Sequence, residues 1–164
     1  MSRTLVLAAV IAVLLPSSGA AQSDNKLVGT WKLVSVSSST VRGEKTTSGF
    51  GEHPTGFITY TREGRMSAII ANGGRKPLSV NSRVTARPDE RAEAYATFLA
   101  YAGRYTFKGD KVVHHVEVAS IQNWVGTDLT RSVTLQGNRV ALRTPVTQVD
   151  GVMRSTELVW EKVK

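Results

Sequence analysis

The 164-residue sequence contains no cysteine. This absence excludes a disulfide framework, a thiolate nucleophile, a cysteine-ligated zinc site and a lipid-modified cysteine. The patterns G-x-S-x-G, H-E-x-x-H, G-x-x-x-x-G-K-[ST] and G-x-G-x-x-G are also missing, so no common hydrolase, metalloprotease or nucleotide-binding motif is present. The three histidines include His53, which stands apart in a loop before Pro54. We therefore predict no metal site and no cofactor.

Long apolar runs are confined to the first 21 residues. Arg3 gives a basic start, residues 4–15 form an almost unbroken apolar run, and Gly19-Ala20-Ala21 offers small residues to signal peptidase. A membrane-spanning helix needs about 20 apolar residues, and this run is shorter, which argues against the alternative of an uncleaved anchor. We expect residues 1–21 to be a secretory signal peptide. Residues 22–164 would then form one mature domain, without a transmembrane segment, in the periplasm or outside the cell.

Acidic residues are the minority, because residues 22–164 contain 20 Lys and Arg against 13 Asp and Glu. The basic residues are scattered singly and form neither a run nor a helical stripe, so we expect no nucleic-acid partner. The excess charge fits solubility, weak attraction to anionic surfaces or a preference for an acidic ligand.

Most of the chain after Leu27 alternates between apolar and polar residues, which is typical of antiparallel strands. Short turns such as Lys108-Gly109-Asp110 and Gly137-Asn138 separate several of these segments. One helix is expected from Pro88, because Ala92, Tyr95, Ala96 and Leu99 share one helical face and Gly103 follows. The eight predicted strands cover residues 29–37, 57–61, 65–71, 104–107, 111–120, 129–136, 139–144 and 155–163.

Eight short strands with one mid-chain helix predict an all-β fold, an eight-stranded antiparallel up-and-down barrel, because closure removes exposed sheet edges. A barrel of this size can enclose one small ligand, with inward and outward residues alternating along each strand. In the first strand the alternation places Trp31, Leu33 and Ser35 on one face. The inward residues predicted by alternation are Trp31, Leu33, Met66, Ala68, Ile70, Tyr105, Phe107, Val112, His114, Val116, Val118, Arg131, Val133, Leu135, Val140, Leu142, Leu158 and Trp160.

Two of these inward residues are polar. An inward Arg131 needs a carboxylate, carbonyl groups or a bound anion, unless it lies at the barrel mouth and reaches water. His114 and His115 are adjacent, so only one of them can face the interior. Alternation favours His114, as a structural or a ligand-binding residue, although the opposite face with His115 and Glu117 stays an alternative lining.

Several segments resemble the lipocalin-like domain family of bacteria and fungi. The first is residues 29–35, GTWKLVS, which is similar to the opening strand of that family. The others are residues 56–61 with 64–68, 101–105, 114–117, 123–127 with Arg131, and 158–161, so that the resemblance covers nearly all of residues 22–164. It implies a lipocalin-like barrel with a central cavity for a small, largely apolar molecule.

Three functional hypotheses follow. In the first, the barrel binds a small apolar or amphipathic ligand without a cofactor, and its candidate binding residues are Trp31, Met66, Tyr105, His114, Val116, Asn123, Arg131 and Trp160. In the second, the protein is a cyclase, isomerase or hydrolase that transfers protons through His114 or His115 with Glu117 or Asp128. In the third, it is an envelope interaction protein with a solid core. The sequence indicates neither the ligand nor the oligomeric state.

Overall fold

The computed structural model describes residues 25–46, 49–149 and 151–164, so the predicted signal peptide lies outside the described residues. In chain order the elements are β1 (Gly29–Thr40), β2 (Lys45–Thr46), β3 (Thr55–Tyr60), β4 (Arg65–Ala71), α1 (Pro88–Ala96), β5 (Phe98–Phe107), β6 (Lys111–Ala119), the 3-10 helix η1 (Gln122–Trp124), β7 (Asp128–Gln136), β8 (Arg139–Arg143), β9 (Thr147–Val149) and β10 (Val152–Lys162). No helix among these residues is long and apolar enough to cross a membrane.

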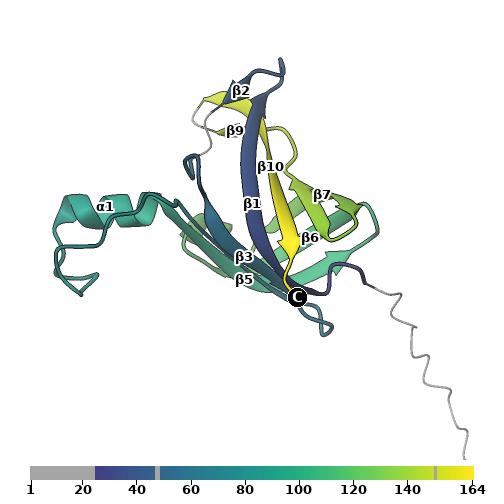
Figure 1. The fold of residues 1–164 in the computed structure, drawn as a ribbon, viewed down its shortest axis with the longest axis horizontal. Coiled ribbons are helices and arrows are strands. Elements are labelled where there is room, and N and C mark those ends of the chain that lie inside the picture. The colour runs from purple at the N-terminus through teal and green to yellow at the C-terminus, as the bar shows by residue number, and fades with distance from the viewer. Residues whose placement is uncertain (1–24, 47–48, 150) are drawn as a thin grey trace, which may run out of the picture.

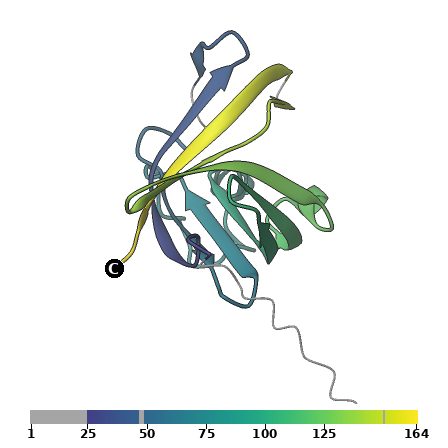
Figure 2. The ribbon, with the colours of Figure 1, turned by 90° about the vertical axis from the view of Figure 1, so that its right-hand side faces the viewer.

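Eight of the strands form a closed antiparallel barrel, as the sequence predicts. They follow the order β1-β3-β4-β5-β6-β7-β8-β10, and β10 pairs again with β1 to close the ring. Figures 1 and 2 show β1 and β10 side by side from two directions, with the short β2 and β9 near one end of this pair. The chain therefore needs no crossover, because each barrel strand lies beside its neighbour in sequence once β2 and β9 are set aside.

The helix is shorter than the sequence predicts. It ends at Ala96, and none of its residues is buried, so the expected apolar helical face is wrong. Leu99 belongs instead to β5, where it pairs with Ile70 of β4. Sheet pairing overrides the helical spacing here, because a strand buries this segment against β4 whereas the helix stands away from the barrel (Figure 1).

Two β-bulges change the alternation. In β1 the register shifts between Leu33 and Ser35, so Ser35 is exposed and Val36 packs against the core. Between β5 and β6 it shifts at Ala102 and Gly103, so Val118 is 62% exposed. The predictions that Ser35 shares the face of Trp31 and Leu33 and that Val118 faces inward are therefore wrong, because one extra residue in a bulged strand reverses the faces beyond it.

The remaining inward residues form one core. Its buried members are Leu27, Trp31, Leu33, Ile58, Tyr60, Met66, Ala68, Ile70, Tyr101, Tyr105, Val112, Val116, Val133, Val140, Leu142 and Trp160. Most of them lie where the alternation places them, and Leu27 is supplied by the segment before β1. We call the barrel end beside this segment the closed end, since Leu27 is fully buried and its carbonyl accepts a hydrogen bond from Trp31 Nε1 at 2.8 Å.

We call the opposite end the mouth. It lies where β1, β4 and β6 end and where β5, β7 and β10 begin. Apolar residues near this end pack against the core but remain partly exposed, namely Val36, Leu99, Ala119, Leu129 and Leu158. Phe107 and Leu135, towards the closed end, are likewise only partly buried.

Candidate functional site

A histidine lies at the centre of the barrel, between two tyrosines. The side chain of His114 is only 1% exposed. Its Nε2 lies 2.7 Å from the hydroxyl of Tyr60, and its Nδ1 lies 3.0 Å from the hydroxyl of Tyr101. These residues come from β6, β3 and β5, and we call them the Tyr-His-Tyr cluster. Three polar side chains thus meet inside an otherwise apolar core.

The surroundings hold this cluster in its neutral form. Burial lowers the pKa of His114 from 6.5 to about 3, with smaller contributions from the charges of Arg131 and His115. Burial raises the pKa of Tyr60 and of Tyr101 above the usual value, while the nearby positive charge of Arg131 opposes the shift of both. At neutral pH the imidazole is therefore uncharged and both phenols keep their protons.

Arg131 lies on β7 in register with Val112 of β6. Its side chain is partly buried, and its Nη1 donates a hydrogen bond to the carbonyl of Thr130 at 2.8 Å. It occurs two residues after Leu129 on the inward face, farther from the mouth than His114, because His114 pairs with Leu129. Arg131 therefore does not lie at the barrel mouth, although its side chain is partly exposed and its charge reaches the Tyr-His-Tyr cluster.

The two interior indole groups differ in their hydrogen bonds. Trp31 Nε1 donates to the carbonyl of Leu27, whereas the buried Nε1 of Trp160 has no hydrogen-bond partner among the described residues. A buried N–H without an acceptor costs free energy, about 1–3 kcal/mol. Trp160 therefore adds an unsatisfied donor to the interior.

The other predicted binding residues lie at several depths. Trp31, Met66, Tyr105 and Val116 are buried in the core, and the hydroxyl of Tyr105 donates to the carbonyl of Thr61 at 2.8 Å. Asn123 is exposed on η1, so it lies apart from the interior group. Trp31 and Tyr105 are near the closed end, farther from the mouth than Tyr101.

The candidate proton-transfer residues divide between two faces. His114 lies inside, whereas His115 lies on the outer face, with its Nδ1 2.7 Å from Asp128 Oδ1 and its Nε2 2.9 Å from Thr106 Oγ1. Glu117 is also outside, where Arg65 donates to both carboxylate oxygens at 2.9 and 2.7 Å. The Arg65 hydrogen bonds lower the pKa of Glu117. The structure therefore joins His115 to Asp128 but brings neither of them to His114.

Sequence reasoning missed both tyrosine partners of His114. The segment containing Tyr60 carries apolar residues on both faces, and Tyr101 follows residues whose spacing also fits a helix. It also missed Ser38. Ser38 is buried near the mouth, where its hydroxyl lies 2.9 Å from that of Thr156, and the bulge in β1 conceals its inward direction.

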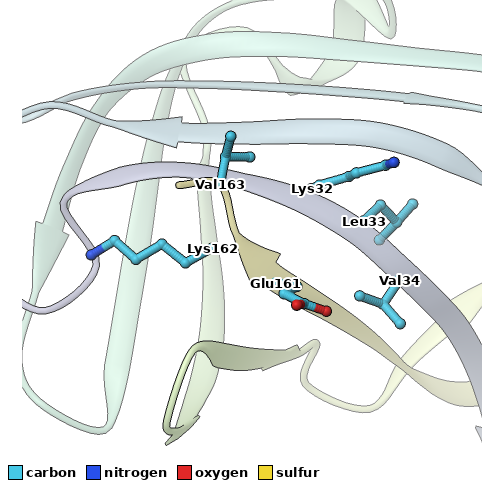
Figure 3. A pocket seen from close by; sticks show the side chains of 6 residues that line it. All are labelled: Lys32, Leu33, Val34, Glu161, Lys162 and Val163. Atoms are coloured by element: carbon cyan, nitrogen blue, oxygen red, sulfur yellow. The ribbon is translucent and has the colours of Figure 1, made fainter.

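A separate groove lies on the outside of the β1–β10 pair. Its lining consists of Lys32, Leu33, Val34, Glu161, Lys162 and Val163. Figure 3 shows the amino groups of Lys32 and Lys162 pointing in opposite directions, and the carboxylate of Glu161 is bonded to Asn138 and Arg139. The groove follows from the bulge at Val34, and its polar groups do not converge on a common point.

The hydrogen bonds of the Tyr-His-Tyr cluster can be tested by stability measurements. Replacing His114 by leucine leaves the hydroxyls of Tyr60 and Tyr101 buried without partners, so we expect H114L to lose about 2 kcal/mol. The triple variant H114L/Y60F/Y101F removes all three polar groups and should recover most of this loss. Urea unfolding at pH 7 measures both effects. A triple variant no more stable than H114L would show that packing, rather than hydrogen bonding, determines the cost.

Comparison with known proteins places the chain in a family. The model of the lipocalin-like domain matches residues 28–163. The chain belongs to the lipocalin-like domain family. A curated relative, the 4'-hydroxy-3'-methoxypropiophenone carrier protein ppsC of Aspergillus oryzae, is 30% identical over 108 residues, which cover 60% of this chain and 96% of the relative.

Two solved structures are also similar to this member of the lipocalin-like domain family. One is a lipocalin-like protein from Bacteroides uniformis, with 16% identity, a TM-score of 0.44, and coverage of 84% of this chain and 98% of the other. The second is an uncharacterized protein from Bacteroides eggerthii, with 16% identity, a TM-score of 0.43, and coverage of 84% and 99%.

Proposed function

We propose that this lipocalin-like domain binds a small, largely apolar molecule in the mouth half of its barrel and holds the polar end of that molecule near the Tyr-His-Tyr cluster. The observation that carries the proposal is the buried His114 with its two tyrosines, which lies below apolar residues that remain partly exposed. Ligand sites commonly combine an apolar lining with a few polar groups that fix orientation. The barrel interior has both features.

Affinity would come mainly from covering the apolar residues at the mouth, such as Leu99, Leu129 and Leu158. Their burial contributes about 25 cal/mol for each Å² removed from water, before the ordering of ligand and side chains is subtracted. Arg131 and the cluster would determine the orientation. The Aspergillus relative is named as a carrier of an aryl ketone, and a molecule of that class has an apolar ring and a carbonyl oxygen, which this arrangement suits.

Native mass spectrometry of the protein purified from the envelope and culture fractions of its own cells tests the proposal. We expect a small molecule bound at one copy per chain, which denaturation releases for identification. A titration with propiophenone, followed by tryptophan fluorescence, tests the same site with a known compound. Absence of both a co-purifying molecule and a saturable response would overturn the proposal in favour of the solid-core hypothesis.

Arg131 should strengthen the binding of an anionic ligand more than that of a neutral one. A guanidinium hydrogen bond to an anion contributes about 1.5–3 kcal/mol, so R131A should weaken binding of 3-phenylpropanoate roughly 10-fold to 100-fold. Binding of the neutral 3-phenylpropanamide should change far less. The matched control is R139A, since Arg139 is paired with Glu161 on the outer face. Isothermal titration of both compounds measures these affinities. If R131A loses as much affinity for the amide as for the acid, Arg131 does not recognise the charge of the ligand.

We also propose that the domain acts after export, in the periplasm or outside the cell, because residues 1–21 resemble a secretory signal. Edman sequencing of the protein from fractionated cells should show an N-terminus near Gln22. A protein that retains Met1 in the cytoplasmic fraction would contradict this localisation.

A further inference from the structure

The Tyr-His-Tyr cluster contains one hydrogen-bond donor more than it can satisfy. A neutral imidazole has one N–H and one acceptor nitrogen, and each phenol has one O–H. The tyrosine opposite the acceptor nitrogen of His114 donates to it, and the tyrosine opposite the N–H accepts from it. The O–H of this second tyrosine then has no acceptor within the cluster. This holds for either tautomer, because Tyr60 and Tyr101 contact different nitrogens of the same ring.

The two tyrosines differ in their access to the mouth. The ring of Tyr60 packs edge-on against Tyr105 at a centroid distance of 4.8 Å, on the side of the closed end. The ring of Tyr101 packs edge-on against Trp124 of η1 at 5.8 Å, and Trp124 is partly exposed. A group that enters through the mouth therefore reaches Tyr101 before Tyr60.

The other polar groups of the interior are also donors. Trp160 Nε1 is buried without a partner among the described residues. The guanidinium of Arg131 consists of donors only. Burial raises the pKa of Tyr60 and Tyr101 more than the charge of Arg131 lowers it, so both phenols keep their O–H groups. The interior thus supplies hydrogen-bond donors in excess of acceptors. A ligand that pairs these donors must carry a hydrogen-bond acceptor.

We propose that the inner end of the ligand is a carbonyl oxygen that accepts a hydrogen bond from the hydroxyl of Tyr101. His114 then carries its proton on Nδ1 and donates to the oxygen of Tyr101, while Tyr60 donates to Nε2. This arrangement uses every donor of the cluster once. The inference rests on the proposed function and adds to it the class of the polar end and the residue that recognises it.

The test uses two compounds of nearly equal shape, propiophenone and propylbenzene, which differ only by a carbonyl in place of a methylene. Their affinities for the wild type and for Y101F are measured by isothermal titration. We expect Y101F to bind propiophenone at least tenfold more weakly, while its affinity for propylbenzene changes less than threefold. Because the comparison is made between proteins, the different hydration of the two compounds cancels. The control variant is Y95F, since Tyr95 lies exposed on α1 outside the barrel.

Two spectroscopic measurements on the complexes keep the inference testable if Y101F folds poorly. The infrared stretch of ¹³C=O-labelled propiophenone bound to the wild type and to Y95F should lie at lower wavenumber than in cyclohexane, which offers no hydrogen-bond donor. Nitrogen-15 NMR of the propiophenone complex should show His114 with its proton on Nδ1.

The possible outcomes separate this inference from the proposed function. If Y101F loses the same affinity for both compounds, or if the proton of His114 is on Nε2, the proposed role of Tyr101 is wrong. The proposed function, ligand binding in the barrel, would still stand. If the wild type binds neither compound, both the proposed function and the inference fail. A weaker affinity of Y101F for propiophenone, with an unchanged affinity for propylbenzene, would support the inference.

Discussion

Acidification should remove about 5 kcal/mol from the free energy of unfolding through His114 alone. Burial, followed by the charges of Arg131 and His115, lowers the pKa of this histidine from 6.5 to about 3, and each unit corresponds to about 1.4 kcal/mol. The unfolded chain takes up the proton below pH 6.5, whereas the folded chain resists it until about pH 3. This part of the stability is therefore complete above pH 6.5 and is lost progressively as the pH falls towards 3.

The variant H114Q isolates this contribution from the carboxyl groups that titrate in the same range. Glutamine offers one donor and one acceptor to the tyrosines but takes up no proton. In urea unfolding at pH 7, 6, 5 and 4, the stability advantage of the wild type over H114Q should shrink by about 1.4 kcal/mol for each unit below pH 6.5. The matched control is H53Q, because His53 is exposed in the loop before β3. Parallel pH profiles for the wild type and H114Q would contradict a neutral buried His114.

The sequence predicts the barrel well because most of its strands have one buried and one exposed face. In β4 the inward residues Met66, Ala68 and Ile70 alternate with exposed neighbours, so the period of two is visible without a structure. Residues 98–101 carry apolar side chains at every position, and periodicity alone then cannot separate a strand from a helix. The start of β5 was missed for this reason.

The site is less predictable than the fold, because its contacts cross the sheet. His114 lies inside, where the alternation places it, but its partners are 54 and 13 residues away in the sequence. Which residues meet across a barrel depends on the register of every intervening pair, and the bulges at Val34 and beside Gly103 shift that register. A single sequence contains no direct signal for such a shift.

Gly103 lies at the bulge between β5 and β6, and G103A should lose more than about 3 kcal/mol, at the upper end of the cost of overpacking. A Cβ at this position would lie 2.0 Å from the carbonyl oxygen of His115 and 3.0 Å from the amide nitrogen of Glu117. Both neighbours are backbone atoms of β6, so they can give way only if the strands separate. The bulge that turns Val118 outward would be disturbed at the same time.

Thermal and urea unfolding of G103A and G49A measure this effect. Gly49 is a matched control, because a Cβ there would meet no atom of the described residues within 4 Å, and G49A should change the stability by less than about 1 kcal/mol. We expect G103A also to weaken the binding of propiophenone, since the Tyr-His-Tyr cluster spans β5 and β6 on either side of this contact. If G103A proves as stable as G49A, β5 and β6 must be able to separate at the bulge without loss of the barrel. The close contact at Gly103 would then not be what fixes the register of the site.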